Sequence, residues 1–320
     1  MPRFDGTYPA AMELIRGLQN LRPRHQGCVA TIGAFDGMHH GHRAVLGKLL
    51  EKSEELGLPS VAVLFEPLPR EYFSPAEAPP RLMSFREKFL ALQDMGLDRV
   101  LRVRFDAKLQ TMRADDFTTR IFVEGLGVRC IVLGDDLRFG HGREGDFKLL
   151  KQHGERYGFQ VMRTSTLGVS GNRVSSTRIR EALADADFSL ARELLGRPYR
   201  ITGKVVYGAQ RGHGLGAPTA NLELHRLRAP VSGVFLVEVD GVATKALPGV
   251  ANVGIRPTLN ESIRANLEVH LLNFSGDLYG RRIGVTFLEK VREEQKFASV
   301  ELLMEQIQKD IALARRFFKT

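Results

Sequence analysis

The sequence predicts an α/β protein, with a doubly wound parallel sheet in the N-terminal half, then a smaller antiparallel barrel or sandwich and a terminal helix. In the first 185 or so residues, short apolar runs alternate with amphipathic stretches, which is typical of a parallel sheet covered by helices on both faces. From residue 199 to 291, short β-rich runs are interrupted by glycine, proline and asparagine, which indicates antiparallel strands. A length of 320 residues suits two such domains.

The N-terminal half contains the elements expected of a parallel sheet. Amphipathic stretches at 42–56 and 114–125 predict helices, and the first places Leu46, Leu49 and Leu50 on one face. Ligands bind beyond the carboxyl ends of the strands in such sheets, so site residues are expected in the loops that follow strands. The predicted strands are 28–33, 60–65, 99–104, 129–134 and 159–164.

The sequence pattern changes at Gly196–Pro198. Apolar runs alternate with helix-like stretches before this position, and short β-rich runs follow it. This position divides the chain into predicted domains 1–195 and 196–320. A helix is expected at 299–318, because apolar residues recur there every three or four positions and form one buried stripe. The predicted strands of this part are 199–207, 233–239, 266–274 and 282–288.

The composition limits the classes of molecule that the protein is expected to bind. The chain has 46 Lys and Arg against 37 Asp and Glu, a net charge of +9, which suits nucleic acid or small polyanions such as nucleotides. No apolar run approaches the ~20 residues of a membrane helix, and the N-terminus lacks the apolar core of a secretory signal. Cys28 and Cys130 each begin an apolar run, so we expect two buried thiols in a reducing, cytoplasmic compartment.

The first polar constellation is GAFDGMHHGH, residues 33–42, between the first predicted strand and its helix. Its glycines, Gly33, Gly37 and Gly41, allow tight turns and a close approach of the backbone to a ligand. The helix N-terminus attracts a phosphate, and His39 and His42 lie three apart at that terminus, where both can donate hydrogen bonds to one anion. A metal site is the weaker interpretation, because no third ligand follows at a suitable spacing.

Two further loops carry polar residues. The stretch VLGDDLRFGHGREGD, 132–146, follows the fourth strand and contains Asp135 and Asp136. The stretch VSSTRIREAL, 174–183, follows the fifth strand, and Ser175 or Ser176 is a candidate helix cap. Taken alone, this second stretch is explained better by a plain cap with two solvated arginines. Because it follows a strand of the same sheet as the histidine motif, phosphate binding is the favoured interpretation. The side chains in it that can reach phosphates are Thr177, Arg178 and Arg180.

The second constellation lies in the β-rich part, in GHGLGAPTANL, 212–222. Thr219 and Asn221 alternate on an extended stretch, so their oxygens face one way and suit a magnesium ion with nucleotide phosphates. Taken alone, the stretch is more simply a glycine- and proline-rich turn entering a strand. In LEVHLLNF, 267–274, Glu268 and His270 share one strand face among apolar neighbours. A carboxylate among apolar side chains is costly unless it is paired or has a functional role.

These stretches carry a family resemblance. GAFDGMHHGH resembles the H-x-G-H signature of the nucleotidyltransferase superfamily and matches its flavin-nucleotide branch, G-x-F-D-G-x-H-x-G-H. Residues 132–146 resemble that branch's base- and ribose-contacting loop, 174–180 its I-S-S-T-R-I-R motif, and LFEPLPREYF, 64–73, its flavin-bordering segment. GLGAPTANL, GVANVGIRPT, LEVH and LYGRRI occur in the order found in riboflavin kinases. The sequence departs from these patterns at Ala34, Leu68, Leu137, Gly214, Ala217 and Ile255.

Nearly the whole chain is therefore similar to the bacterial bifunctional riboflavin kinase/FMN adenylyltransferases, also called prokaryotic FAD synthetases. The resemblance implies a six-stranded antiparallel barrel with a C-terminal helix. It also implies two reactions, in which riboflavin is phosphorylated by ATP to FMN and FMN is adenylylated by a second ATP to FAD, with release of pyrophosphate. It further implies small-molecule partners, namely riboflavin, FMN and ATP, and Mg²⁺ as the cofactor.

The resemblance also assigns roles to residues. Glu268 is the expected general base of the kinase, and Thr219 and Asn221 the expected holders of Mg²⁺ and ATP. His39 and His42 are the expected catalytic residues of adenylyl transfer. The remaining nucleotide- and phosphate-binding residues are expected to be Gly33, Phe35, Asp36, Gly37, Gly41, Asp136, Ser176, Thr177, Arg178, Arg180, Gly216 and Pro218.

Two other functions are weighed against this one. An RNA-binding protein with a barrel module would suit the basic charge, but the chain has no tryptophan, and the aromatic residues of 199–291 lie among apolar residues rather than basic ones. A nucleotidyltransferase with another acceptor, such as a nicotinate or pantetheine phosphate, would leave the second domain's motifs unexplained. We therefore expect neither nucleic acid nor membrane as a partner.

Overall fold

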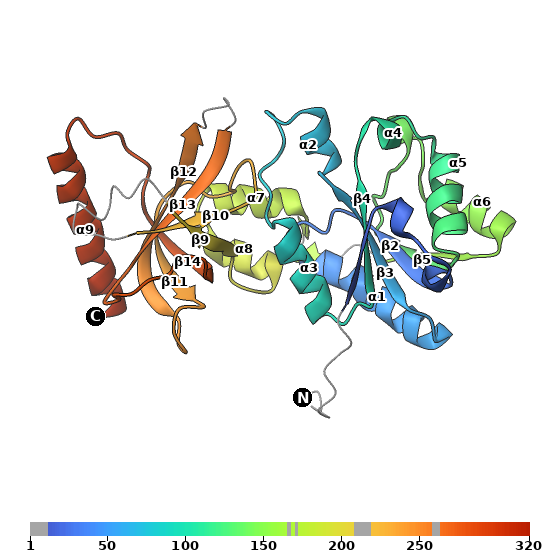
Figure 1. The fold of residues 1–320 in the computed structure, drawn as a ribbon, viewed down its shortest axis with the longest axis horizontal. Helices are drawn as coiled ribbons and strands as arrows, with labels where there is room; N and C mark the ends of the chain where they lie inside the picture. The colour runs from blue at the N-terminus through green and yellow to red at the C-terminus, as the bar shows by residue number, and fades with distance from the viewer. Residues whose placement is uncertain (1–11, 165–167, 170–171, 208–218, 258–262) are drawn as a thin grey trace. The chain divides into compact units, whose positions relative to one another are not determined.

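The chain folds into two compact units in a computed structural model that describes residues 12–164, 168–169, 172–207, 219–257 and 263–320 (Figure 1). Unit 1 comprises the described residues up to Ala78 together with Phe85–Val174. Unit 2 comprises Pro79–Ser84 and Ser175–Thr320.

Unit 1 contains the predicted parallel sheet. Its six strands lie in the order β1-β4-β3-β2-β5-β6, and every neighbouring pair is parallel. Every residue of the central strand β2 is buried, which is why its sequence reads as a continuous apolar run. The strands are β1 (Glu13–Arg16), β2 (Cys28–Ile32), β3 (Ser60–Glu66), β4 (Arg99–Arg104), β5 (Val128–Leu133) and β6 (Gln160–Arg163).

Helices connect these strands. The predicted helix at 114–125 is present, but its first turn, α5, continues as a π-helix, η3, so the sequence predicted a helix and not its type. A hairpin of β7 (Gly168–Val169) and β8 (Asn172–Arg173) precedes unit 2. The helices of unit 1 are α1 (His40–Leu56), α2 (Pro69–Phe73), α3 (Phe85–Asp94), α4 (Ala107–Gln110), α5 (Ala114–Phe117), η3 (Thr118–Gly125) and α6 (Phe147–Tyr157), with short 3-10 turns η1 (Leu18–Asn20), η2 (Pro23–His25) and η4 (His141–Arg143).

Both cysteines are free and fully buried, as predicted. Burial raises the pKa of the Cys28 thiol to about 12, so the group stays protonated at neutral pH. Burial also raises the pKa of Cys130. The two thiols therefore act as small apolar side chains in the core.

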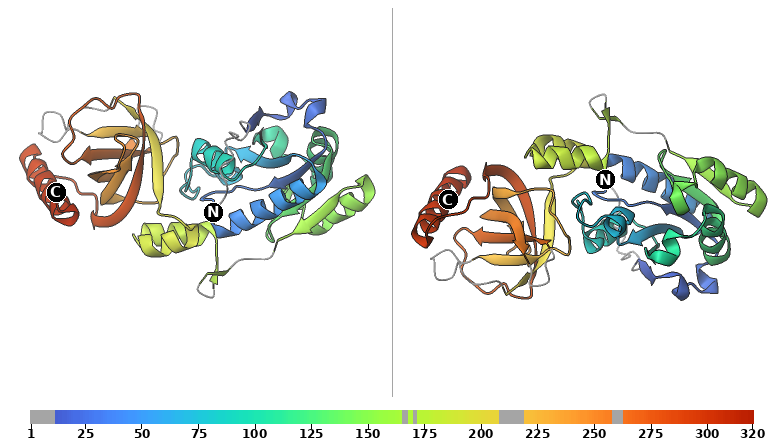
Figure 2. Two further views of the ribbon diagram at one scale, coloured as in Figure 1. Left: turned by 90° about the horizontal axis from the view of Figure 1, so that it is seen from below. Right: turned by 90° about the horizontal axis from the view of Figure 1, so that it is seen from above.

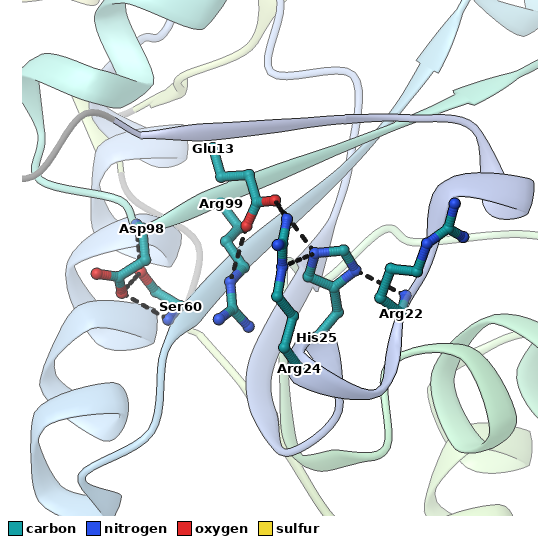
Figure 3. Close-up of polar contacts among 7 residues, drawn as sticks. All are labelled: Glu13, Arg22, Arg24, His25, Ser60, Asp98 and Arg99. Carbon is teal, nitrogen blue, oxygen red and sulfur yellow. Dashed lines mark hydrogen bonds and ion pairs between the residues drawn. The ribbon is translucent and has the colours of Figure 1, made fainter.

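A polar cluster fastens the edge strand β1 at the amino ends of the strands (Figure 3). Glu13 Oε1 lies 2.5 Å from Arg24 Nη2 and 3.2 Å from Nε2 of the buried His25, and Glu13 Oε2 lies 3.6 Å from Arg99 Nε. Nearby, Asp98 Oδ2 accepts hydrogen bonds from the backbone N–H and the hydroxyl of Ser60. These residues lie at or just before the starts of strands. The cluster is therefore at the opposite end of the strands from the loops that contain the candidate site residues.

Unit 2 contains a closed barrel of six strands in the order β10-β13-β12-β11-β14-β9, with all neighbours antiparallel (Figure 2). This confirms the predicted barrel, although β10 and β12 were not among the predicted strands. Its elements are α7 (Ser176–Ala184), α8 (Phe188–Leu195), β9 (Arg200–Val206), β10 (Ala220–Glu223), β11 (Gly233–Asp240), β12 (Leu247–Pro257), β13 (Ile263–Leu271), β14 (Arg282–Arg292) and α9 (Val300–Phe318).

Aromatic contacts join helix α8 to the barrel. The Phe188 ring of α8 lies 5.8 Å from the ring of Phe235 and 6.1 Å from that of Phe287. The segment 79–84 also packs with this unit, since the Tyr199 hydroxyl donates to the carbonyl of Leu82 at 3.2 Å. Helix α8, which ends before Gly196, thus packs against the barrel, and the domain division at 195 and 196 stays a prediction.

Helix α9 is attached to the barrel by apolar contacts and one ion pair. Ile311 and Ala314 pack against Leu236 and neighbouring strand residues, as the predicted apolar stripe requires. The Arg292 guanidinium of β14 contacts both carboxylate oxygens of Asp310, with Nη2 2.8 Å from Oδ2, and the Asp310 side chain is only 5% exposed. Within the described residues, none of the helices combines the length and apolar character needed to cross a membrane.

Replacing Asp310 by alanine should loosen α9 from the barrel. Removal of one partner leaves the largely buried Arg292 charge without its carboxylate, which costs about 3 kcal/mol of unfolding free energy. Denaturant unfolding of the full chain and hydrogen exchange of α9 amides measure this effect. Lys309→Ala, which removes an exposed ion pair on the same helix, is the control and should leave both measurements unchanged. Equal behaviour of the two variants would contradict the assignment.

Candidate functional site

The loop between β2 and α1 turns sharply where the histidine motif lies. Phe35 and Met38 have positive φ angles of 46° and 47°, and Gly37 has one of 91°. These left-handed residues reverse the chain within a few positions and place His39 at the N-cap of α1. Phe35, Asp36 and Met38 are buried, so the loop is a packed part of unit 1.

The two predicted catalytic histidines lie in contact. Nδ1 of His39 accepts a hydrogen bond from the backbone N–H of His42 at 3.3 Å, and the two rings stack with centroids 3.6 Å apart. An acceptor at Nδ1 means that the neutral His39 ring carries its proton on Nε2. A Cβ at Gly41 would lie 3.1 Å from Cε1 of His39, so glycine leaves room for the ring, and a Cβ at Gly33 would lie 3.0 Å from the Phe35 ring.

Burial lowers the pKa of His39 from 6.5 to about 4. The Asp36 carboxylate opposes this shift, and the charges of His40 and Arg173 add to it. His39 is therefore neutral at pH 7 and can donate one hydrogen bond through Nε2. That His39 donates this hydrogen bond to a phosphate stays a prediction.

Arg173 is a candidate site residue that the sequence analysis did not name. Its Nη2 lies 2.8 Å from Asp135 Oδ1 and 2.9 Å from Asp136 Oδ2, so the β8 hairpin is joined to the loop after β5. The charges of Asp136 and Arg173 both act on the pKa of His39, which places them in its neighbourhood. The only sequence signal for Arg173 is its position directly before the VSSTRIR stretch.

The VSSTRIR stretch begins helix α7 in unit 2. Ser175, rather than Ser176, is the N-cap, because its hydroxyl oxygen accepts from the backbone N–H of Arg178 at 3.2 Å. Ser176 and Thr177 lie in the first turn of the helix, and Arg180 Nε donates to the carbonyl of Pro80 at 2.6 Å. That Ser176, Thr177, Arg178 and Arg180 bind phosphates stays a prediction.

A row of polar side chains crosses the outer face of the barrel. Glu268 of β13 lies directly opposite Asn221 of β10 on one side and Asn252 of β12 on the other. The alternate residues Leu267 and Val269 are fully buried and point to the barrel interior. The predicted general base and the predicted metal-binding amide are therefore neighbours.

The amide oxygens in this row are buried acceptors. Oδ1 of Asn221 and Oδ1 of Asn252 have no hydrogen-bond partner among the described residues, and Asn221 is only 8% exposed. Asn266 Nδ2 donates to Glu268 Oε1 at 2.9 Å and holds that carboxylate. Thr219, which is half-buried, lies two residues before Asn221, whereas the predicted Gly216 and Pro218 lie outside the described residues.

A pocket of about 610 Å³ adjoins one end of the row. Thr219 and Asn221 line it, together with residues of β9 and β13 and the segment 274–279. The rings of Tyr207 and Tyr279 stack at 3.9 Å in its wall. The pocket thus combines aromatic faces with the oxygen atoms that a hard cation prefers.

The described residues contain no cluster of three His, Cys, Asp or Glu side chains arranged to hold a metal ion. The donor set beside the pocket consists instead of one hydroxyl, one amide oxygen and a neighbouring carboxylate, in Thr219, Asn221 and Glu268. This set fits Mg²⁺, which binds through few protein oxygens and keeps ligands from substrate phosphates.

The depressed pKa of His39 should make the protein less stable in acid. Between pH 6.5 and 4 the unfolded chain binds a proton that the folded ring does not, so the free energy of unfolding falls as the pH drops through this window. His39→Asn keeps a capping side chain and removes the titrating group, so its stability should depend less on pH in this window. Denaturant unfolding at several pH values, with an NMR titration of His39, makes the comparison. Equal pH slopes, or an NMR pKa near 6.5, would contradict it.

Two protein-family models match successive parts of the chain, in the order expected from the sequence motifs. The family model described as FAD synthetase matches residues 21–178, and the one described as riboflavin kinase matches residues 195–318. A crystal structure described as a macrolide-efflux protein from Streptococcus pneumoniae superposes with a TM-score of 0.75 at 28% identity, over 96% of this chain and 99% of that one.

Curated relatives match almost end to end. The bifunctional riboflavin kinase/FMN adenylyltransferase of Pseudomonas fluorescens is 52% identical over 304 residues, which are 95% of this chain and 97% of that protein. The protein of the same name from Escherichia coli K12 is 50% identical over 308 residues, 96% of this chain and 98% of that protein. With both family models matched and such identity over nearly its full length, the chain belongs to the family of bifunctional riboflavin kinase/FMN adenylyltransferases.

Proposed function

We propose that the chain makes FAD from riboflavin in two reactions, with the kinase site in unit 2 and the adenylyltransferase site in unit 1. The observation that carries this proposal is the separation of two unlike polar constellations. Unit 1 has hydrogen-bond donors at the N-terminus of α1 and the Arg173 guanidinium near His39, and unit 2 has a carboxylate between two buried acceptor oxygens. The first constellation suits phosphate anions, and the second suits an alcohol and a cation.

In the kinase reaction, the primary hydroxyl of riboflavin attacks the γ-phosphorus of ATP. Glu268 accepts the hydroxyl proton as the new oxygen–phosphorus bond forms, and the bond to the β,γ-bridging oxygen breaks to release ADP. The pocket with Tyr207 and Tyr279 receives the nucleotide, and Thr219 and Asn221 hold its magnesium complex. When bound, Mg²⁺ neutralises phosphate charge and orients the γ-phosphate.

In the second reaction, a phosphate oxygen of FMN attacks the α-phosphorus of another ATP, and the bond to the α,β-bridging oxygen breaks to release pyrophosphate. His39, through Nε2, and His42, which stacks on it, donate hydrogen bonds to the phosphate oxygens. The N-terminal end of α1 adds its partial positive charge. Arg173 exchanges its contact with Asp135 for phosphate oxygens, while Asp136 contacts the nucleotide. Arg178 and Arg180 at the start of α7 are the other proposed phosphate-binding side chains.

The partners of this enzyme are small molecules, and no nucleic acid is among them. The excess of basic residues is then accounted for by substrates that are all anions except riboflavin. The free, buried cysteines fit a reducing compartment, and a cytoplasmic location is part of the proposal.

Incubation of the purified chain with riboflavin, Mg²⁺ and ATP tests the proposal. Chromatography of the flavins should show FMN first and FAD later, with ADP and pyrophosphate as co-products. Riboflavin that remains unchanged would refute the kinase assignment. FMN that accumulates without FAD would refute the adenylyltransferase assignment alone.

Replacing His42 by alanine should abolish adenylylation of added FMN and leave riboflavin phosphorylation near normal. The imidazole lies at the α1 N-terminus in unit 1, whereas the residues proposed for the kinase reaction belong to unit 2. A donor to transition-state charge contributes about 100- to 1,000-fold to the rate. Both half-reactions are measured on one preparation, and less than a tenfold loss of adenylylation would count against the role.

Replacing Glu268 by glutamine should lower kinase turnover by about 100- to 10,000-fold, because the side chain keeps its shape but loses the proton acceptor. Riboflavin binding, measured by flavin fluorescence, and adenylylation of FMN should stay unchanged. Equal losses in both reactions would indicate misfolding. Normal FMN production would show that the carboxylate is structural only.

A further inference from the structure

Asn252 is a polar residue of the barrel to which neither the sequence patterns nor the proposed mechanism gives a role. It lies directly opposite Glu268, on the side away from Asn221 and the pocket. Its Oδ1 atom is buried and has no hydrogen-bond partner among the described residues. A buried acceptor without a donor costs free energy, so a group that remains in this state in the free protein is explained by a ligand that supplies the donor.

Glu294 fixes which way the Asn252 amide faces. The Glu294 carboxylate can only accept hydrogen bonds, and Asn252 Nδ2 lies 3.5 Å from its Oε1 atom. Nδ2 therefore faces Glu294, and Oδ1 is the atom left for a ligand. The carboxylate occupies the space above Gly254, where a Cβ would collide with it, so the absence of a side chain at 254 is part of this arrangement.

Asn252 lies on the other side of Glu268 from the residues proposed to hold the cation. Asn221 and Asn252 are two strand spacings apart, roughly 10 Å between backbones, with Glu268 on the strand between them. Asn221 lines the pocket, whereas Asn252 is not among the residues that line it. If Asn221 serves the cation and phosphates, Asn252 serves a group on the other side of the general base.

We propose that Asn252 is a specificity-determining residue of the kinase reaction, whose Oδ1 accepts a hydrogen bond from a secondary hydroxyl of the riboflavin side chain. This rests on the proposed kinase function. The order along the barrel face is then nucleotide pocket, Asn221, Glu268 and Asn252, which is the order of donor, base and acceptor. By holding the polyol chain, Asn252 presents the terminal hydroxyl to Glu268, and Glu294 acts as a positioning residue behind it.

The test compares two acceptors with the full-length protein. One is riboflavin, and the other is the same flavin ring with a 5-hydroxypentyl chain, which keeps the terminal hydroxyl and lacks the secondary ones. Wild-type protein should prefer riboflavin in kcat/KM, and Asn252→Ala should reduce this preference roughly five- to tenfold, the value of one neutral hydrogen bond. The KM for ATP, the Mg²⁺ requirement and the adenylylation of FMN should not change.

Two more variants complete the experiment. Glu294→Ala should reduce the preference by a smaller factor than Asn252→Ala, and it keeps the proposal testable if Asn252→Ala does not fold. Glu238→Ala, which removes an exposed carboxylate from neighbouring strand β11, is the matched control and should leave the preference unchanged.

Each outcome decides between the possible roles. Equal losses for both acceptors would make Asn252 structural, and a raised Mg²⁺ requirement with unchanged preference would assign it to the cation; either result overturns the proposal. Wild-type protein that phosphorylates neither acceptor would refute the kinase function itself, and wild-type protein without a preference for riboflavin would refute only the role of Asn252.

Discussion

Strand register decides which polar side chains meet in this protein. Successive side chains of a strand point to opposite faces, so a slip of one residue exchanges the two faces completely. In β13, a slip would drive the Glu268 carboxylate into the barrel and bring Leu267 to the surface, which the cost of burying an unpaired charge forbids. The apolar barrel interior therefore enforces the register that sets Glu268 between Asn221 and Asn252. In unit 1 the fully buried strand β2 has the same effect, because its end at Ile32 fixes where the histidine loop begins.

Elements with a clear period could be predicted from the sequence, and elements shaped by their neighbours could not. Five strands of the parallel sheet and helix α9 lie within a few residues of their predicted bounds, since their apolar patterns are continuous or strictly periodic. Strand β1 was missed because it is short and lies at the sheet edge, where the contacts of Glu13 fasten it. Strand β12 was missed because glycine and proline interrupt it. Gly249 is one such residue, and a Cβ there would lie 2.7 Å from the carbonyl oxygen of His270 on the adjacent strand, so close strand packing requires the residue that disguises the strand.

Some candidate site residues could likewise be predicted from the sequence, and others depend on contacts that form only in the fold. His39 and His42 were predicted because their spacing and their place at a strand-to-helix junction are visible in the sequence, and the structure stacks them at the N-terminus of α1. Arg173 and Asn252 were not predicted, because each matters through partners distant along the chain: Asp135 in one case and Glu268 in the other. Neither residue type is unusual where it stands. The lowered pKa of His39 was equally invisible, since it depends on burial by the folded loop.

The two constellations differ in a way that the chemistry of the two acceptors explains. The acceptor in the kinase reaction is an alcohol, which must lose a proton as it attacks, and unit 2 provides a carboxylate flanked by acceptor oxygens. The acceptor in adenylyl transfer is a phosphate monoester, whose second pKa of about 6 leaves it largely ionised at neutral pH. It therefore needs no base. Unit 1 accordingly offers donors: a His39 ring that is neutral at pH 7, the Arg173 guanidinium and the end of a helix. A neutral imidazole also keeps its hydrogen-bonding state constant across the physiological range, so phosphate binding at the proposed site should not vary with titration of His39.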